Sequence, residues 1–321
     1  MSDERRHPVL TVVADGVTMV DTVMTGEPDF NAVYVLEGDE PALVETGPGA
    51  DLPLVLEALE ALGIGPEDLA HVVVTHIHLD HAGGAGSLAE RFPGATIWAH
   101  DRGAPHLADP ARLVASTART YGDERMRAFF GETVPVPAGR LRSVQDADTI
   151  SLGNRALEVV HTPGHASHHV ALHDTRSGAL FTGEAIGSFL PWGPAFRPAL
   201  PPPEVDVEAA VASIDRMRRR RPSALLTSHF GPAPDVGEAF DAATDRIHAW
   251  SDTVRATLTR DAEAEVDEVA RALRDLAEDE FERETGRAID LARYDAIGSI
   301  RMNATGLSRY WRKRWEREAG A

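Results

Sequence analysis

Four side chains of the kinds that bind metal ions lie within six residues, directly after a short apolar run. The run, residues 71–75, is typical of a buried strand. The four side chains that follow are His76, His78, Asp80 and His81. Side chains two residues apart on extended backbone point to the same side, so the first two imidazoles should face one region. Because so many polar groups cannot be buried together without partners, the cluster predicts a metal centre at the end of a buried strand.

The composition restricts the ligands and partners of such a centre. The 321 residues include 14 histidines and no cysteine, so disulfides and thiolate ligands are excluded and a metal must be held by His, Asp or Glu. The formal net charge of −19 repels phosphate backbones. We therefore expect a small-molecule substrate and no nucleic-acid partner.

Hydropathy gives no indication of a membrane protein. No apolar run reaches the roughly 18 residues that a membrane span needs. Residues 1–8 are charged and lack the apolar stretch of a secretory signal. We expect no membrane partner and a cytoplasmic location.

The apolar pattern predicts strands and helices in two successive halves. Val-rich segments bounded by turn residues are typical of strands. Strands are predicted at 9–13, 17–23, 32–36, 42–45, 71–75, 96–99, 141–144, 156–161, 169–173, 179–182 and 224–227, and helices at 51–62, 83–91 and 206–220. Residues 105–131 are interpreted as a mostly helical or loop-like insertion near the site. This order predicts two packed sheets with helices outside.

The composition changes near Asp235, after which Ala, Arg, Asp and Glu dominate. Strand signals end there, and helices are predicted at 236–261, 263–284 and 290–316. We predict a catalytic domain over 1–233 and a helical domain over 234–321.

Three later motifs accompany the first cluster in order. They are His161-Thr-Pro-Gly-His165, Phe181-Thr-Gly-Glu184 and Ser228-His229-Phe-Gly. Together with His76–His81, which matches His-x-His-x-Asp-His, this series over residues 8–233 resembles the metallo-β-lactamase superfamily. The resemblance implies an α+β fold, the four-layer αββα sandwich of that family, with a C-terminal all-helical extension. It also implies that this helical domain caps the active site, supplies substrate contacts or forms a homodimer.

The resemblance also implies a ligand set for two divalent metal ions. One metal would be held by His76, His78 and His165, the second by Asp80, His81 and His229, and Glu184 would bridge them. Zinc is the expected metal, with iron or manganese as alternatives for imidazole and carboxylate ligands. Two positions depart from the family, which usually has Asp where this chain has Glu184 and where Glu45 precedes Thr-Gly.

A dinuclear centre implies a hydrolase. A hydroxide bridging the metals would attack a small ester, lactone or thioester, and Asp80 would act catalytically by accepting a proton or orienting the nucleophile. The chain is interpreted as a hydrolase near lactonases and glyoxalase II-like proteins. It lacks the Tyr that lactonases often carry, having Gly187, and the extra His of glyoxalase II, having Ile77.

Other activities and residues stay open at this point. The alternatives are a mononuclear iron dioxygenase of the persulfide-oxidising type and a phosphodiesterase or nuclease. Some further side chains could contact substrate or only pack and cap: the aromatics Phe189, Trp192 and Phe196, and the histidines His100, His106, His168 and His169.

Overall fold

The computed structural model describes residues 7–193, 196–296 and 299–320. These residues form two compact units, and each unit draws on separate stretches of the chain. The first comprises the described residues up to His161, His168–Gly183 and Pro222–Pro232. The second comprises Thr162–Ser167, Glu184–Arg221 and the described residues from Ala233 onward.

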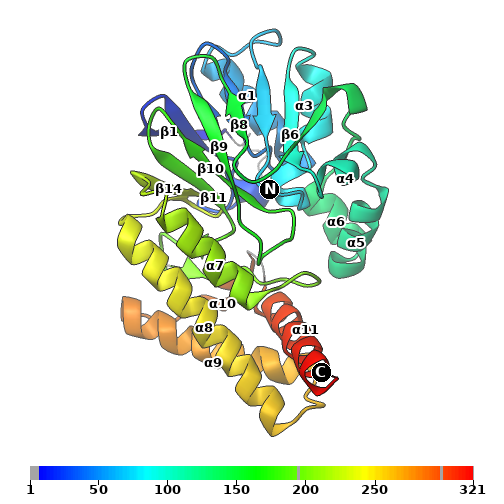
Figure 1. Cartoon of the computed structure of the whole chain (residues 1–321), viewed down its shortest axis with the longest axis vertical. Helices are drawn as coiled ribbons and strands as arrows, with labels where there is room; N and C mark the ends of the chain where they lie inside the picture. Colours follow the sequence, from blue (N-terminus) through cyan, green and yellow to red (C-terminus); the bar gives the residue numbers. More distant parts are fainter. Residues whose placement is uncertain (1–6, 194–195, 297–298, 321) are drawn as a thin grey trace, which may run out of the picture. The chain divides into compact units, whose positions relative to one another are not determined.

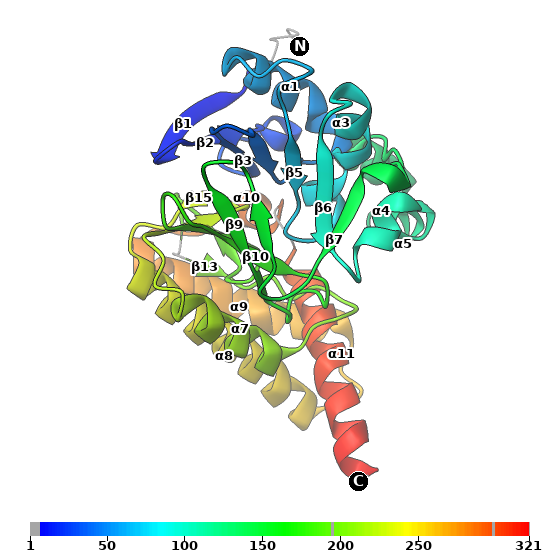
Figure 2. The same cartoon turned by 45° about the horizontal axis from the view of Figure 1, so that its top comes forward.

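A seven-stranded sheet in the first unit follows the order of the chain. Its strands are β1 (Val9–Ala14), β2 (Val17–Asp21), β3 (Ala32–Leu36), β4 (Ala42–Val44), β5 (His71–Val73), β6 (Thr96–His100) and β7 (Leu141–Val144). The first four strands pair antiparallel, and β4 to β7 pair parallel. The carboxyl ends of these parallel strands therefore share one edge of the sheet, where β5, β6 and β7 lie side by side (Figure 2).

The second sheet of this unit has six strands in the order β15-β14-β11-β10-β9-β8. They are β8 (Thr149–Ser151), β9 (Ala156–His161), β10 (Val170–Asp174), β11 (Ala179–Gly183), β14 (Ala224–Thr227) and β15 (Gly231–Pro232). β11 and β14 are parallel, and the other neighbours are antiparallel. β8 and β15 were missed in the sequence because each is only two or three residues long.

Apolar side chains pack on both faces of the first sheet. On one face, a cluster that includes Val35, Leu59, Val72 and Leu88 joins the sheet to α1 (Leu52–Ala61), α3 (Ala85–Arg91) and α4 (Ala104–Ala108). Figure 1 shows α1 and α3 alongside these strands. On the other face, a second cluster that includes Tyr34 and Phe181 joins the two sheets. The predicted pair of packed sheets with outer helices is thus present in this unit.

The remaining short elements of the first unit lie in its connections. They are the 3-10 turns η1 (Met24–Gly26), η2 (Gly49–Asp51) and η3 (Ala138–Arg140), and the helices α2 (Leu79–Ala82), α5 (Ala111–Tyr121) and α6 (Asp123–Phe130). α4, α5 and α6 form the helical insertion that was predicted over 105–131.

The second unit contains a two-stranded hairpin and helices. Its elements are β12 (Ser188–Phe189), β13 (Phe196–Arg197), α7 (Val207–Arg218), α8 (Val236–Arg260), α9 (Val266–Thr285), α10 (Leu291–Ala296) and α11 (Ile300–Ala319). α8, α9 and α11 pack on one another around buried Trp250, Leu273 and Leu307. The Trp311 Nε1 atom donates to the Ser251 carbonyl at 3.0 Å and fastens α11 to α8.

The single helix predicted over 290–316 is wrong. The structure has α10 and α11 instead, and a new N-terminus begins at Ser299. The Ser299 Oγ atom accepts from Met302 N at 3.2 Å, and Asp295 Oδ1 accepts from Ile300 N at 2.6 Å. These caps stabilise a restart because they satisfy amide groups that a helix N-terminus leaves without partners.

The predicted domain boundary stays a prediction, because compactness divides the chain along other lines. The second unit includes residues 162–167 and 184–221 in addition to the C-terminal helices. Among the helices of the described residues, none is both long and apolar enough to cross a bilayer.

Candidate metal centre

The first two histidines converge at the carboxyl end of β5. His76 is buried, His78 is half-buried, and the His76 Nε2 and His78 Nδ1 atoms lie 3.1 Å apart. Their ring centroids are 4.6 Å apart. This is the arrangement expected from their spacing of two, since extended backbone presents both rings to one side. Ile77 between them is buried in the apolar cluster instead.

Asp80 lies between two further imidazoles. Its Oδ2 atom is 3.4 Å from His81 Nε2 and 3.3 Å from His229 Nε2. His81 and Asp80 come from α2, and His229 follows β14, so side chains 149 positions apart in the sequence lie close together. Burial acts to raise the pKa of Asp80, but the two imidazoles outweigh it and hold this pKa well below its usual range.

His229 presents one defined nitrogen to Asp80. Its Nδ1 atom lies 2.7 Å from the carbonyl oxygen of Phe30. A carbonyl only accepts, so Nδ1 carries a proton, and Nε2 is the ring nitrogen that faces the Asp80 carboxylate. Two electron-rich atoms in such proximity repel unless a proton or a metal cation lies between them. The donor set of Asp80, His81 and His229 therefore fits a metal ion, with ligand atoms all within 4.8 Å of one another.

Glu45 is a fully buried carboxylate behind His81. Its Oε1 atom accepts from Thr75 Oγ1 at 2.5 Å and Ser228 Oγ at 2.9 Å, and lies 3.4 Å from His81 Nδ1. Its Oε2 atom accepts from Thr75 N at 3.2 Å. Glu45 thus holds the Nδ1 side of His81, which leaves Nε2 toward Asp80, as expected for a carboxylate that orients a metal ligand.

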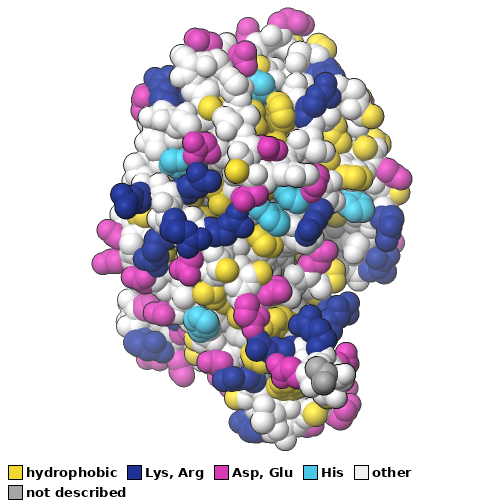
Figure 3. Space-filling model, in the orientation of Figure 1, with side chains coloured by type: hydrophobic (Ala, Val, Ile, Leu, Met, Phe, Trp, Pro, Cys, Tyr) yellow, Lys and Arg dark blue, Asp and Glu magenta, His cyan; other side chains and the backbone are white. Residues whose placement is uncertain are grey.

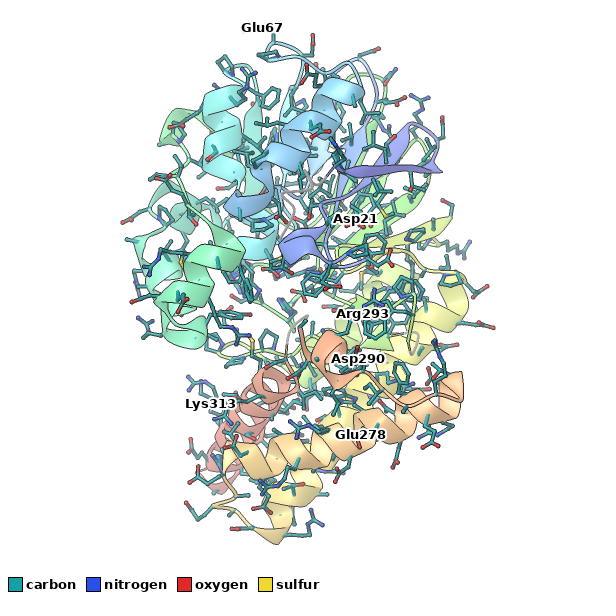
Figure 4. All side chains as sticks on the ribbon, turned by 180° about the vertical axis from the view of Figure 1, so that it is seen from behind. Asp21, Glu67, Glu278, Asp290, Arg293 and Lys313 are labelled. Carbon is teal, nitrogen blue, oxygen red and sulfur yellow. The ribbon has the colours of Figure 1, made fainter. Side chains whose placement is uncertain are left out.

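The loop between β2 and β3 supports the same ligands, and the sequence did not indicate this. Asn31 Nδ2 donates to the Asp80 carbonyl at 2.8 Å, and Phe30 provides the acceptor for His229. The carboxylate of Asp21, labelled in Figure 4, accepts from Val23 N at 2.8 Å and Asp29 N at 2.9 Å and ties the loop ends together. A backbone carbonyl and a loop amide leave no sequence pattern that could have identified them.

The other two predicted ligands lie in the second unit. The His165 Nε2 and Glu184 Oε2 atoms are 3.1 Å apart, and both side chains are largely buried. His165 Nδ1 lies 2.8 Å from the Ala199 carbonyl, so this ring also donates through Nδ1 and turns Nε2 to a carboxylate. Imidazole and carboxylate again form a donor pair suited to a divalent cation.

The remaining histidine candidates lie in three places. His168 and His169 lie beside the first ligand, with ring centroids 6.3 Å and 4.9 Å from that of His76. His100 stacks on His161 at 4.6 Å and contacts Asp101 at 2.9 Å. The pKa of His100 is lowered, mainly by burial and to a smaller extent by the charge of the neighbouring His161. His106 lies in α4.

The predicted aromatic residues pack within the second unit. The Phe189 and Phe196 rings lie 5.5 Å apart across the β12–β13 hairpin. Trp192 lies 6.4 Å from the Phe281 ring, and the guanidinium of Arg293, labelled in Figure 4, sits 4.5 Å from the Trp192 ring. These contacts favour the interpretation that the aromatic side chains stabilise the 185–203 segment by packing.

Comparison with known proteins identifies relatives over about half to two thirds of the chain. The family model described as the metallo-beta-lactamase superfamily matches residues 25–229. The chain is 33% identical over 182 residues to the acyl-coenzyme A thioesterase MBLAC2 of Gallus gallus, covering 50% of this chain and 60% of that protein. It is 30% identical over 156 residues to a hydroxyacylglutathione hydrolase of Gloeobacter violaceus, covering 49% of each. The matched part of the chain thus covers about three fifths of the length of the first relative and about half of the length of the second.

Solved structures confirm the predicted fold class. A metallo-beta-lactamase family protein of Thermus thermophilus shares 21% identity with a TM-score of 0.63 over 95% of both chains. An archaeal metallo-beta-lactamase superfamily protein of Sulfolobus tokodaii shares 20% identity with a TM-score of 0.61, over 73% of this chain and 86% of that one. The fold is α+β, and α8 to α11 form the helical extension.

Proposed function

Because the chain belongs to the metallo-beta-lactamase superfamily, we propose that it is a metal-dependent hydrolase of small thioesters or related esters. The observation that carries the proposal is the approach of His81 and His229 to one oxygen of Asp80, at 3.4 and 3.3 Å, while the other nitrogen of each ring faces an acceptor oxygen. Such preoriented ligands are typical of a working metal site.

The proposed centre holds two divalent metal ions. His76, His78 and His165 would bind the first, Asp80, His81 and His229 the second, and Glu184 both. Zinc is the proposed metal, because imidazole and carboxylate ligands without thiolates suit it, although iron and manganese accept the same donors.

Different residues of the chain have different roles in the proposed hydrolysis. Divalent ions bound here would supply Lewis acidity and lower the pKa of bound water toward neutrality. Asp80 is ionised throughout the neutral range, because its imidazole neighbours hold its pKa low. With 26% of its side chain exposed, it can orient a nucleophilic water or accept its proton. Glu45 and Phe30 fix the rings of His81 and His229 during this step.

Thioesters are the proposed substrate class among the esters. The two relatives described above are named as an acyl-coenzyme A thioesterase and a hydroxyacylglutathione hydrolase, which supports thioesters. Ile77 does not conflict with this, because its side chain lies in the apolar core. A lactonase-type Tyr at position 187 is disfavoured by geometry. Gly187 has φ +84°, and a Cβ there would lie 2.1 Å from the Arg197 carbonyl oxygen.

The structure also weighs on the alternative activities. A mononuclear iron dioxygenase needs only the first set of ligands, whereas this chain assembles Asp80, His81 and His229 as well. Against a nuclease, Figure 3 shows basic and acidic side chains interspersed on the face it draws, within a chain of net charge −19.

Metal content and turnover test the proposal together. We expect about two zinc ions per chain by elemental mass spectrometry, and hydrolysis of an acyl-coenzyme A or acylglutathione thioester that stops when the metal is chelated. Asp80→Ala should remove metal and turnover, whereas the matched control His106→Ala in α4 should retain both. About one iron per chain with oxygen-dependent activity would overturn the proposal, as would full activity of the metal-free protein.

A further inference from the structure

One peptide group in the second unit links a proposed metal ligand to the C-terminal helix α11 by two hydrogen bonds. This peptide joins Ala199 to Leu200. Its carbonyl oxygen lies 2.8 Å from His165 Nδ1, and its N–H donates to Asn303 Oδ1, also at 2.8 Å. The Leu200 and Asn303 side chains are both 2% exposed.

The direction of each hydrogen bond follows from the groups involved. The carbonyl can only accept, so His165 donates its Nδ1 proton, and the Asn303 amide oxygen accepts from the Leu200 N–H. The two bonds use opposite ends of one peptide dipole, so each strengthens the other in a buried setting. His165 Nε2 is thereby left without a proton in the neutral ring and points to Glu184.

Gly306, one turn further along α11, lets the helix approach this peptide. A Cβ at position 306 would lie 2.1 Å from the Leu200 carbonyl oxygen and 2.9 Å from the carbonyl carbon of Pro201. A backbone that close cannot be avoided by a side-chain rotation. α11 therefore contacts Leu200 on both sides, by a hydrogen bond at its N–H and by close packing at its carbonyl.

We infer that Asn303 is a positioning residue for His165, and that it acts through the Ala199–Leu200 peptide group. The inference rests on the proposed function, in which His165 binds metal. It assigns α11 a role in orienting a ligand, because the helix fixes the acceptor that selects the tautomer and the plane of that ring.

Three variants separate this role from general stabilisation of the helix. Asn303→Ala removes the acceptor, and Asn303→Asp keeps an acceptor oxygen of the same reach. Ser251→Ala is the matched control. The Ser251 hydroxyl contacts Trp311 of α11 at 3.2 Å but takes no part in the hydrogen bonds that join His165, the Ala199–Leu200 peptide and Asn303. If Asn303→Ala does not fold, Asn303→Ser replaces it, since the shorter hydroxyl does not reach the Leu200 N–H.

Two measurements test whether Asn303 positions His165 through this peptide. The first is the exchange rate of the His165 Nδ1 proton in the metal-free full chain, by NMR of ¹⁵N-histidine-labelled protein, assigned with His165→Gln. The second is zinc affinity by competition with a chelator. For Asn303→Ala we expect faster proton exchange and zinc binding weakened by roughly 10- to 100-fold, with both properties retained in Asn303→Asp and Ser251→Ala.

The inference is overturned if Asn303→Ala changes neither quantity more than Ser251→Ala, or if Asn303→Asp is as impaired as Asn303→Ala. Failure of the proposed function is a different result. A wild-type chain that binds no zinc would refute the metal centre, whereas proton exchange in the metal-free protein would still report whether Asn303 holds the peptide that holds His165.

Discussion

Glu45 stands where the family resemblance led us to expect an aspartate, and its longer side chain meets a specific set of donors. Its two oxygens accept from Thr75 and Ser228 and face His81 Nδ1. The backbone at Glu45 has φ +64°, a conformation that few side chains adopt and that strained functional positions often show. The position is thus adapted to orient a ligand from behind.

Replacing Glu45 should weaken the metal centre without unfolding the chain. Glu45→Gln preserves size but replaces one of the two acceptor oxygens by an NH₂ group, so either Thr75 N or the donors that share the other oxygen lose their acceptor. We expect zinc affinity to fall roughly 10- to 100-fold, measured by competition titration. The control Glu40→Gln removes a carboxylate that pairs with His71 at the surface, 2.9 Å from its Nε2. Equal affinities in the two variants would contradict this role for Glu45.

The buried Arg155–Asp174 pair provides a pH dependence of stability. Burial raises the pKa of Asp174, but hydrogen bonds from Arg155 and Ser177 outweigh it and lower the pKa below its ordinary 3.8. An acid with a lowered folded pKa contributes stability above its unfolded pKa and loses it as the pH falls through the folded one.

Asp174→Asn should therefore be costly at neutral pH and less so in acid. Because the buried Arg155 would lose its counter-charge, we expect a loss of about 3 kcal/mol in the free energy of unfolding near pH 7. The difference between wild type and variant should shrink as the pH falls below 3.8. Urea unfolding across this range measures it, and a difference independent of pH would refute the argument.

At the scale of elements, regular patterns were predicted and irregular ones were not. Long amphipathic helices such as α8 and Val-rich strands such as β3 were predicted from their periodicity. The two-residue strands β12 and β13 were missed, because two residues show no alternation. The restart at Ser299 was missed since its cap depends on Asp295, whose contribution appears only once the helices are placed.

For the candidate site, the sequence indicated the side chains that occur in motifs but not the groups that support them. Four motifs follow one another along the chain, so the proposed ligands from His76 to His229 could be named as candidates from the sequence. Phe30, Asn31 and Ala199 could not, because two of them act through backbone carbonyls and Asn31 contacts a backbone oxygen. Such contacts depend on tertiary placement and not on residue type.

The β12–β13 hairpin depends on a glycine at its start. Gly187 has φ +84° and faces the Arg197 carbonyl so closely that Gly187→Ala must strain or displace the backbone. We expect a loss of about 2 kcal/mol or more in the free energy of unfolding, measured by urea denaturation. Gly139→Ala is the control, since a Cβ there meets nothing within 4 Å. Equal stability of the two variants would contradict this account.

At the scale of the whole molecule, the helices after residue 233 are part of a larger compact unit. That unit also contains residues 162–167 and 184–221, which carry His165 and Glu184. Two residues of the C-terminal helices contact these segments. Asn303 accepts a hydrogen bond from Leu200 N, and the Tyr294 carbonyl accepts one from the Arg197 guanidinium. The expectation that the helices act as a separate cap thus needs a direct test.

Truncation after residue 233 provides that test. Because it removes the core around Trp250 and Leu273 on which the remaining segments pack, we expect poor soluble yield, reduced thermal stability and less than one zinc ion per chain. Circular dichroism and elemental mass spectrometry measure these properties against the full chain. A truncated protein with full metal content and only an altered substrate range would instead support a detachable cap.

The course of the chain between the units limits how such a protein can be recombined. The backbone passes from one unit to the other five times, after residues 161, 167, 183, 221 and 232. A hybrid joined at residue 233 would take the ligand-bearing segments from one parent and the helices against which they pack from the other. Asn303, Gly306 and the Ala199–Leu200 peptide are therefore expected to be inherited together, and exchanging the helical part alone would separate partners that have to match.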